Sequence, residues 1–200
     1  VQLEMETVDL KAVLTGAVEQ VRPLIDARRH ALRTRLPAGS LWVRGDRTRL
    51  TQIASNLLNH AAKSTPEGGE ITLDARTEDG QVVVHVHDNG QGIEPGLLPQ
   101  IFDLFTQAER TPDRSQGGLG IGLALVRSLV ALHGGAISAD SAGRGRGATF
   151  TVRLPQVAAP AAADSPAGHA GFVAGDCALP VVGVDDNVDA AQTLQILLEA

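Results

Sequence analysis

Tyrosine is absent from this 200-residue chain, and aromatic residues make up only 2% of it. Cysteine occurs once, at Cys177, so neither an intramolecular disulfide nor a cysteine-rich zinc site can form. No run approaches the roughly 20 apolar residues that a membrane-spanning helix needs, and the first residues lack the regions of a signal peptide. We therefore expect a soluble chain.

The chain has fewer basic than acidic residues: 17 Lys and Arg against 23 Asp and Glu give a formal net charge of −6. The arginines are scattered singly or in pairs, which argues against a nucleic-acid-binding protein. A share of 43% hydrophobic and 20% charged residues is that of an ordinary globular chain. The length allows one sizeable domain and a piece of another, and the ends favour a fragment of a longer protein.

The spacing of apolar residues predicts three helices. The first carries apolar residues from Val8 to Ile25 with Asp9 as its N-cap, the second begins after Asp46, and the third runs over about 119–133. Strands are predicted at 31–36, 41–44, 70–76, 81–88, 136–140 and 148–154. The turn E-D-G joins 70–76 to 81–88 as a hairpin, and the long glycine-punctuated region over 89–120 is of a kind that is usually functional.

The chain divides into three parts by composition. Residues 1–155 carry the periodic segments, and 156–178 are rich in Ala, Pro and Gly, which predicts a flexible linker. Residues 179–200 predict one buried strand, which ends in Asp185 and Asp186, and one amphipathic helix. Because two such elements cannot bury their own apolar faces, we interpret them as the start of a second, truncated domain.

Glycines gather in three clusters, D-N-G-Q-G-I at 88–93, G-G-L-G-I-G at 117–122 and G-R-G-R-G at 143–147. Glycine lets backbone amides approach a phosphate or a purine ring, and a helix that starts at the second cluster directs its dipole at an anion. A dinucleotide-binding fingerprint would have to follow a first strand directly, which it does not here, and the P-loop pattern is absent.

Asp88 ends the strand 81–88 on the same side as its alternating valines, so its carboxylate should point into the apolar layer. There an adenine amino group could be its partner; alternatively, Asp88 merely opens the turn at Asn89 and Gly90. His85 and His87 face the other way and are expected to be ordinary solvent-face residues, with a metal site as the alternative.

Asn56, His60 and Lys63 follow the spacing i, i+4, i+7, which puts them on one face of the second helix. An amide, an imidazole and an ammonium in a row suit contact with a metal and a triphosphate. The alternative is that they form the solvent-facing side of the helix.

Together, the segments 52–69, 88–93, 101–105, 117–126 and 143–150 resemble the N, G1, F, G2 and G3 boxes of the histidine-kinase ATP-binding domain. The resemblance implies an α/β fold of the Bergerat type, a two-layer sandwich with a mixed β-sheet covered on one face by helices, and a lid at about 103–118. It also implies a reaction of bacterial two-component phosphorelays, in which the γ-phosphoryl group of Mg-bound ATP passes to a histidine on a separate dimerisation domain.

By the same resemblance, Asp88 corresponds to the adenine ligand, Gly92 to the backbone beside the base and Thr149 to a member of its water network. Asn56 and Lys63 are the implied catalytic residues. The implied ATP-binding residues are Asn56, His60, Lys63, Asp88, Gly90, Gly92, Ile93, Phe105, Gly118, Leu119, Gly120, Gly122, Leu123 and Thr149. Phe102 and Phe105 correspond to the pair that anchors the lid, with core packing as the alternative.

The N box departs from the family at His60, which stands where an asparagine usually binds magnesium. Magnesium prefers oxygen ligands, so a degenerate nucleotide-binding module without kinase activity is the alternative function. Ser64 also replaces a common aromatic. Related ATPases place a water-activating glutamate at the position of Asn56, which favours a kinase here.

Residues 179–200 resemble the start of a receiver domain, in which Asp185 and Asp186 would belong to a magnesium site, and the whole resembles a hybrid sensor histidine kinase. The expected metal ligands are thus Asn56, His60, Asp185 and Asp186, and the expected cofactors are ATP and Mg²⁺. None of the histidines lies in the family's phosphoacceptor context, so the expected partners are a dimerisation domain upstream, the receiver domain and a second copy of the full-length protein. The expected location is the cytoplasm, with an upstream membrane anchor left open.

Overall fold

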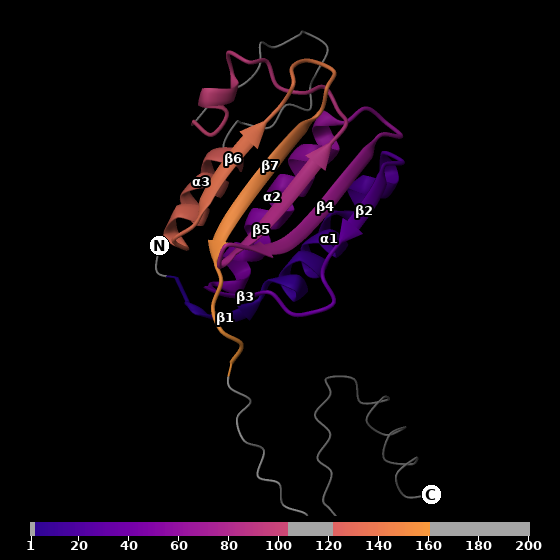
Figure 1. Ribbon diagram of the computed structural model, residues 1–200. Helices are drawn as coiled ribbons and strands as arrows, with labels where there is room; N and C mark the ends of the chain where they lie inside the picture. The colour runs from indigo at the N-terminus through magenta and orange to yellow at the C-terminus, as the bar shows by residue number, and fades with distance from the viewer. Residues whose placement is uncertain (1–2, 104–121, 161–200) are drawn as a thin grey trace, which may run out of the picture. The chain divides into compact units, whose positions relative to one another are not determined.

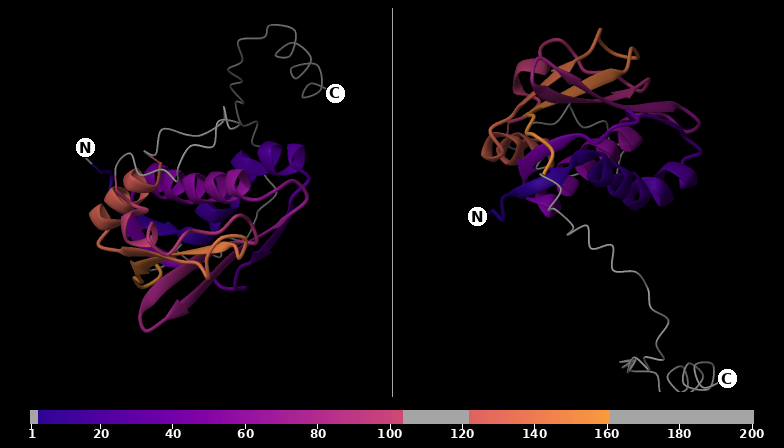
Figure 2. Two further views of the ribbon diagram at one scale, coloured as in Figure 1. Left: turned by 90° about the horizontal axis from the view of Figure 1, so that it is seen from above. Right: turned by 60° about the horizontal axis from the view of Figure 1, so that its bottom comes forward.

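The computed structural model describes residues 3–103 and 122–160, which form two layers, a sheet and the helices that cover one of its faces (Figure 1). In the left view of Figure 2, where the domain is seen from above, the helices and the sheet form separate layers. The elements in chain order are β1 (Glu6–Asp9), α1 (Leu10–Ala27), β2 (Ala31–Arg35), β3 (Trp42–Gly45), α2 (Arg47–Ser64), β4 (Glu70–Glu78), β5 (Gln81–Asp88), the short 3₁₀ helix η1 (Leu98–Gln100), α3 (Gly122–Leu132), β6 (Ala136–Asp140) and β7 (Ala148–Pro155).

The main sheet is mixed and has five strands in the order β2-β4-β5-β7-β6. β2 is parallel to β4, and the other neighbours are antiparallel. The predicted hairpin of β4 and β5 is confirmed, and its turn is made by Asp79 and Gly80, both at positive φ. Such a turn matches the right-handed twist of the strands that it joins. The expected mixed sheet, covered on one face by helices, is therefore confirmed.

Both predicted helix N-caps are confirmed. The Asp9 carboxylate accepts hydrogen bonds from the backbone N–H of Lys11 and of Leu41, each at 3.0 Å. Asp46 accepts from the backbone N–H of Arg49, also at 3.0 Å. These bonds satisfy amide groups that have no partner within the first turn of a helix.

One sequence-based expectation at the start of the chain is wrong. The apolar spacing predicts Val8 in the first helix, but it lies in β1 and pairs with Val43 of β3 in a separate two-stranded sheet. A four-residue strand whose partner lies more than 30 residues away leaves little local signal, and the apolar spacing of α1 continues through it.

Within the described residues, the core between the layers is mainly aliphatic, and its fully buried aromatic ring is that of Phe150. α2 contributes Leu57 and Leu58 to the buried cluster that also contains Leu73 of β4 and Val86 of β5. Phe150 of β7 is 0% exposed in the same cluster. Among the described helices, none is both long and apolar enough to cross a membrane.

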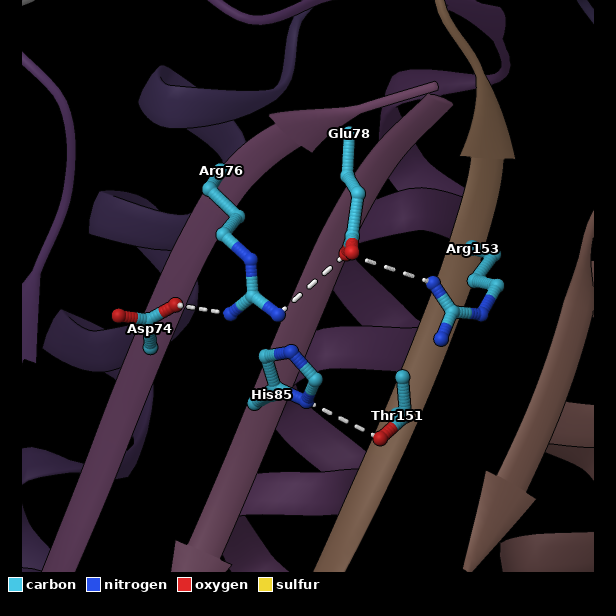
Figure 3. Close-up of polar contacts among 6 residues, drawn as sticks. All are labelled: Asp74, Arg76, Glu78, His85, Thr151 and Arg153. Carbon is cyan, nitrogen blue, oxygen red and sulfur yellow. Dashed lines mark hydrogen bonds and ion pairs between the residues drawn. The ribbon is translucent and has the colours of Figure 1, made fainter. Parts of the chain in front are cut away.

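The outer face of the sheet is polar and holds a small ion-pair network (Figure 3). The Arg76 guanidinium contacts the carboxylates of Asp74 and Glu78, and Glu78 also contacts Arg153 at 3.8 Å. Val83 lies between Arg76 and Arg153 in the strand register and is 0% exposed. Surface ion pairs are individually weak. The aliphatic parts of the two arginine side chains therefore contribute to stability mainly by shielding Val83 from water.

His85 and His87 lie on this outer face, as predicted. The Nδ1 of His85 is 3.0 Å from the Thr151 hydroxyl, and the Nδ1 of His87 is 2.9 Å from the Thr149 hydroxyl. Burial, followed by the nearby Arg76, lowers the pKa of His85. The described residues contain no group of three or more His, Cys, Asp or Glu that could hold a metal.

The chain stays attached to the sheet slightly beyond the last predicted strand. The backbone N–H of Gln156 donates to the carbonyl of Gly80, and that of Val157 donates to the carbonyl of Trp42. These residues belong by sequence to the expected linker over 156–178, so its first two positions are held by the domain. The expected receiver segment 179–200 lies outside the described residues.

Asp46 provides a test of the α2 cap. Replacing Asp46 with Ala is expected to lower the free energy of unfolding by about 1 kcal/mol, whereas Asp46→Asn, which keeps an acceptor, should lose less. The hydrogen bond from Arg49 lowers the pKa of Asp46, so its contribution is present above the unfolded pKa of 3.8 and is lost as the pH falls below it. Urea unfolding at pH 7 and pH 3 measures this; an Ala variant as stable as the wild type at pH 7 would contradict it.

Candidate functional site

The carboxylate of Asp88 is buried at the end of β5. The residue is 1% exposed, and its Oδ1 accepts a hydrogen bond from the backbone N–H of Gly90 at 2.9 Å. Its Oδ2 is buried and has no hydrogen-bond partner in the structure. Burial raises the pKa of Asp88. A buried acceptor without a partner costs free energy, so this oxygen is placed to receive a donor from a bound molecule.

Near Asp88, backbone segments approach each other closely at glycines. An added Cβ on Gly147 would collide with the carbonyl oxygen of Asp88, and one on Gly90 would collide with the carbonyl oxygen of Ser64. Gly92, at φ +66°, packs in the same way against the carbonyl oxygen of Gly143. The glycines of the first and third clusters therefore allow close approach between backbone segments. The approach to a phosphate or a purine ring that the sequence predicts for them stays a prediction.

Main-chain hydrogen bonds join these segments into one unit. The turn at 88–93 binds the end of α2 through the bond from the Gln91 N–H to the Ser64 carbonyl, at 3.0 Å. It binds the loop at 141–147 through the bond from the Gly145 N–H to the Gln91 carbonyl, at 2.7 Å. A further bond runs from the Gly147 N–H to the Gly90 carbonyl. Asp88 thus lies in a cradle of three chain segments, which we call the Asp88 cradle: the 88–93 turn, the 141–147 loop and the end of α2.

The polar stripe Asn56, His60 and Lys63 lies along α2, which ends at this cradle. Asn56 and His60 are half-buried and Lys63 is exposed. The ring of His60 stands edge-on to Phe150 with 5.2 Å between the centroids. Burial, with a smaller contribution from Lys63, lowers the pKa of His60 to about 4, so its imidazole is neutral at neutral pH.

These side chains do not fit Mg²⁺ at the position of His60. Mg²⁺ requires near-octahedral coordination by oxygen, and His60 offers only nitrogen, on a ring that packs against Phe150. Asn56 is the one residue of the stripe with a side-chain oxygen. His60 therefore cannot supply the oxygen ligand that magnesium needs at this position.

Phe102 also packs edge-on against Phe150, with 6.2 Å between the centroids. His60, Phe150 and Phe102 thus form a row of rings that runs from α2 through β7 to the segment after η1. For Phe102 the structure shows the core contact, which was one of the two interpretations of this residue. Such edge-on pairs contribute about 0.5–1.5 kcal/mol beyond burial.

Thr149 is not brought to the cradle, contrary to the expectation from the resemblance. Its hydroxyl bonds to His87 on the outer face of the sheet. Residues paired across an antiparallel ladder share a face, and the partner of Asp88 is Ala148, which is 4% exposed. The same two-residue alternation that places Asp88 inward also applies to β7. With Phe150 inside, it places Ala148 inward and Thr149 outward.

The structure accounts for the other predicted residues as follows. Gly90, Gly92 and Ile93 lie in the turn beside Asp88, and Ile93 is 7% exposed. Gly122 begins the described part of α3, and Leu123 is 8% exposed on its inner side. The remaining predicted site residues lie outside the described residues: Phe105, Gly118, Leu119, Gly120, Asp185 and Asp186.

Two contributors to the cradle were not found by the sequence. The carbonyl of Ser64 receives the Gln91 N–H, and the hydroxyl of Ser141 bonds to the backbone N–H of Ile93 at 2.9 Å. A backbone carbonyl has no residue-type signal. Ser141 stands two positions before the glycines of the third cluster, which was the only available hint.

Residues 45–158 match the family model described as histidine kinase-, DNA gyrase B- and HSP90-like ATPase. The chain belongs to this family. The matched range covers α2, the 88–93 turn and the 141–147 loop, so it includes every described part of the Asp88 cradle. The chain therefore carries the ATP-binding catalytic domain of a sensor histidine kinase.

Similar curated proteins are sensor kinases. The histidine protein kinase DivJ of Caulobacter vibrioides is 38% identical over 82% of this chain and 27% of its own length. The sensor histidine kinase WalK of Bacillus subtilis is 38% identical over 60% of this chain and 20% of its own length. This chain thus spans about a quarter of such relatives.

Solved structures agree in fold. The mycobacterial sensor histidine kinase MprB superimposes with a TM-score of 0.66 at 29% identity, over 76% of this chain and 97% of that one. Full-length ShkA in complex with AMPPNP gives a TM-score of 0.69 at 30% identity, over 80% of this chain and 33% of that one. The described domain therefore has the Bergerat-type α/β fold of histidine-kinase catalytic domains.

Gly92 tests the close approach that forms the cradle. Gly92→Ala is expected to lower the free energy of unfolding by about 2 kcal/mol and to weaken ATP binding at least tenfold, because φ is positive and the new Cβ would push against the Gly143 carbonyl. Gly96→Ala is the matched control, since its Cβ would meet nothing within 4 Å. Thermal unfolding and ATP titration measure both effects; equal behaviour of the two variants would refute the role of the close approach.

Proposed function

We propose that this chain is the ATP-binding catalytic core of a hybrid histidine kinase, which transfers the γ-phosphoryl group of ATP to a histidine on a dimerisation domain outside this chain. The single observation that carries the proposal is the buried, unpartnered Oδ2 of Asp88 inside a glycine-lined cradle. Adenine has an exocyclic amino group, which would donate to that oxygen. The structure of ShkA with AMPPNP supports an adenine nucleotide as the ligand.

Within this proposal, each described residue has a physical task. Asp88 recognises the base, and the backbone of Gly92 packs beside it. Lys63, in the last turn of α2, is exposed at the cradle's edge and supplies positive charge to the phosphates. Asn56 offers an amide to the same triphosphate. For the residues outside the described ranges, the sequence-based assignment to the lid and to the start of α3 remains a prediction.

The absence of a general base at Asn56 favours transfer to a protein side chain over hydrolysis. A carboxylate there could take a proton from water, whereas an amide cannot. In the proposed reaction, the bond between the γ-phosphorus and the bridging oxygen of ATP breaks, a bond to an acceptor histidine nitrogen forms, and ADP leaves. We propose that the acceptor lies on the protein's own dimerisation domain in a homodimer.

The alternative is a degenerate nucleotide-binding module with a regulatory role and no transfer. The specific observation in its favour is His60, whose ring packs against Phe150 at the position expected to hold magnesium. In this case ATP would bind through Asp88 and Lys63, and the chain would respond to nucleotide without catalysis.

The remaining parts of the proposal rest on sequence alone. Residues 179–200 are proposed to begin a receiver domain, with Asp185 and Asp186 at its magnesium site. Residues 156–178 are proposed to link it to the kinase core. ATP and the phosphorelay place the proposed site of action in the cytoplasm, and no nucleic-acid partner is proposed.

Replacing Asp88 with Asn tests the base-recognition role. ATP affinity should fall at least about tenfold, because an acceptor for the adenine amino group is replaced by a donor. Since burial raises the pKa of Asp88, its protonated form stabilises the fold at low pH, and this contribution is lost as the pH rises through the folded pKa. The variant should therefore gain stability relative to the wild type between pH 4 and pH 7.

Calorimetric ATP titration and urea unfolding at both pH values provide the measurements. Asp140→Asn, an exposed aspartate at the end of β6, is the control. Unchanged ATP affinity in the Asp88 variant would remove Asp88 from the site.

His60→Asn separates the kinase from the regulatory alternative. Restoring an oxygen ligand should tighten Mg-ATP binding by about tenfold, and manganese serves as a comparison metal. Phosphohistidine should form when a histidine-bearing dimerisation domain is supplied as a separate protein, with the wild type and the variant both active. Asn59→Ala, one position away on α2, controls for general damage to the helix. Transfer by the variant alone would favour the regulatory module, and transfer by neither would contradict the kinase.

A further inference from the structure

The hydroxyl of Ser141 makes hydrogen bonds to three backbone groups. It accepts from the N–H of Ile93 at 2.9 Å and from the N–H of Gly143 at 3.3 Å. It donates to the carbonyl of Gly147 at 2.6 Å, which is shorter than the 3.4 Å to the carbonyl of Gly143. A hydroxyl has one proton to donate and two lone pairs, so this group is fully used.

These partners belong to the two loops that flank Asp88. Ile93 closes the 88–93 turn, while Gly143 and Gly147 lie at the two ends of the glycine run in the 141–147 loop. Gly147 packs against the backbone of Asp88, and Gly92 packs against Gly143. The Ser141 hydroxyl therefore ties together the segments whose close approach forms the Asp88 cradle.

We propose that Ser141 is a positioning residue of the nucleotide site, which holds the Asp88 cradle in its binding geometry before the nucleotide arrives. The proposal rests on the proposed function, because it presumes that the cradle binds ATP. Ser141 acts through the backbone and not through direct contact with the nucleotide.

The energetic reason is the flexibility of a glycine-rich loop. The 141–147 loop contains glycines at 143, 145 and 147, each at positive φ, and such a loop has many accessible conformations when nothing restrains it. Ordering it on binding would reduce affinity, and a hydroxyl that orders it beforehand removes that cost. The cradle's direct main-chain bonds, such as that of Gly145 to Gln91, remain when the hydroxyl is removed.

The experiment compares Ser141→Ala, Ser141→Thr and Ser138→Ala in the full 200-residue chain. Ser138 is the matched control. It lies in β6, the strand that leads into the 141–147 loop, it is exposed, and it makes no side-chain hydrogen bond within the described residues. We expect Ser141→Ala to weaken ATP binding by about tenfold, Ser141→Thr to return affinity to within about twofold of the wild type because it keeps the hydroxyl, and Ser138→Ala to match the wild type.

A second readout distinguishes positioning from general destabilisation. By NMR, amide exchange in Ser141→Ala should accelerate at Ile93 and Gly143, while the amides of β4 and α1 keep their wild-type protection. ATP affinity equal to that of the wild type, or uniformly accelerated exchange, would overturn the proposal. Failure of the wild type itself to bind ATP would instead overturn the proposed function, so the two failures are distinguishable.

Discussion

The proposed ATP site is organised around one carboxylate, that of Asp88, which the fold buries. Asp88 satisfies one oxygen with the N–H of Gly90 and leaves the other without a partner in an apolar layer. Burial raises the pKa of this group, which shows that the fold accepts an electrostatic cost at this point. Proteins retain such costs where function needs them, and the surrounding sheet and helices provide the stability that offsets them.

Close backbone contact is the means by which that carboxylate is surrounded. The end of α2, the 88–93 turn and the 141–147 loop meet through glycines that could not carry a side chain without collision. Main-chain bonds and the Ser141 hydroxyl then join the three segments. Because the walls of the cradle are largely backbone, its shape depends on where the helices and strands place their ends and less on which side chains are nearby.

The row of rings formed by His60, Phe150 and Phe102 connects this site to the core. Phe150 is fully buried, and the other two rings stand edge-on to it, one from α2 and one from the segment after η1. In a chain with only 2% aromatic residues, two edge-on contacts among three rings at this location are a concentrated feature. His60 packs its ring against Phe150 and offers no side-chain oxygen, so its chemistry does not fit the magnesium ligand expected at this position.

Much of the fold could be predicted because its signals are local. Asp9 and Asp46 precede apolar periods and cap α1 and α2, and the alternation in 81–88 placed Asp88 inward and His85 outward. The glycine clusters indicated close approach to a ligand. The apolar spacing wrongly predicts Val8 of the brief β1 in the helix that follows it, because the partner strand β3 is distant in sequence.

Only the tertiary structure decided which residues and loops contact one another. It paired Asp88 with Ala148 and placed Thr149 on the far face with His87, it turned the His60 ring to Phe150, and it gave the Ser141 hydroxyl its three backbone partners. Apart from the bonds of Ser141 to Gly143 and Gly147 within its own loop, these contacts join segments far apart in the chain. Residue types, caps and alternation were determined by the sequence itself because they depend on near neighbours, whereas register across the sheet and the meeting of loops depend on the packing of the whole domain.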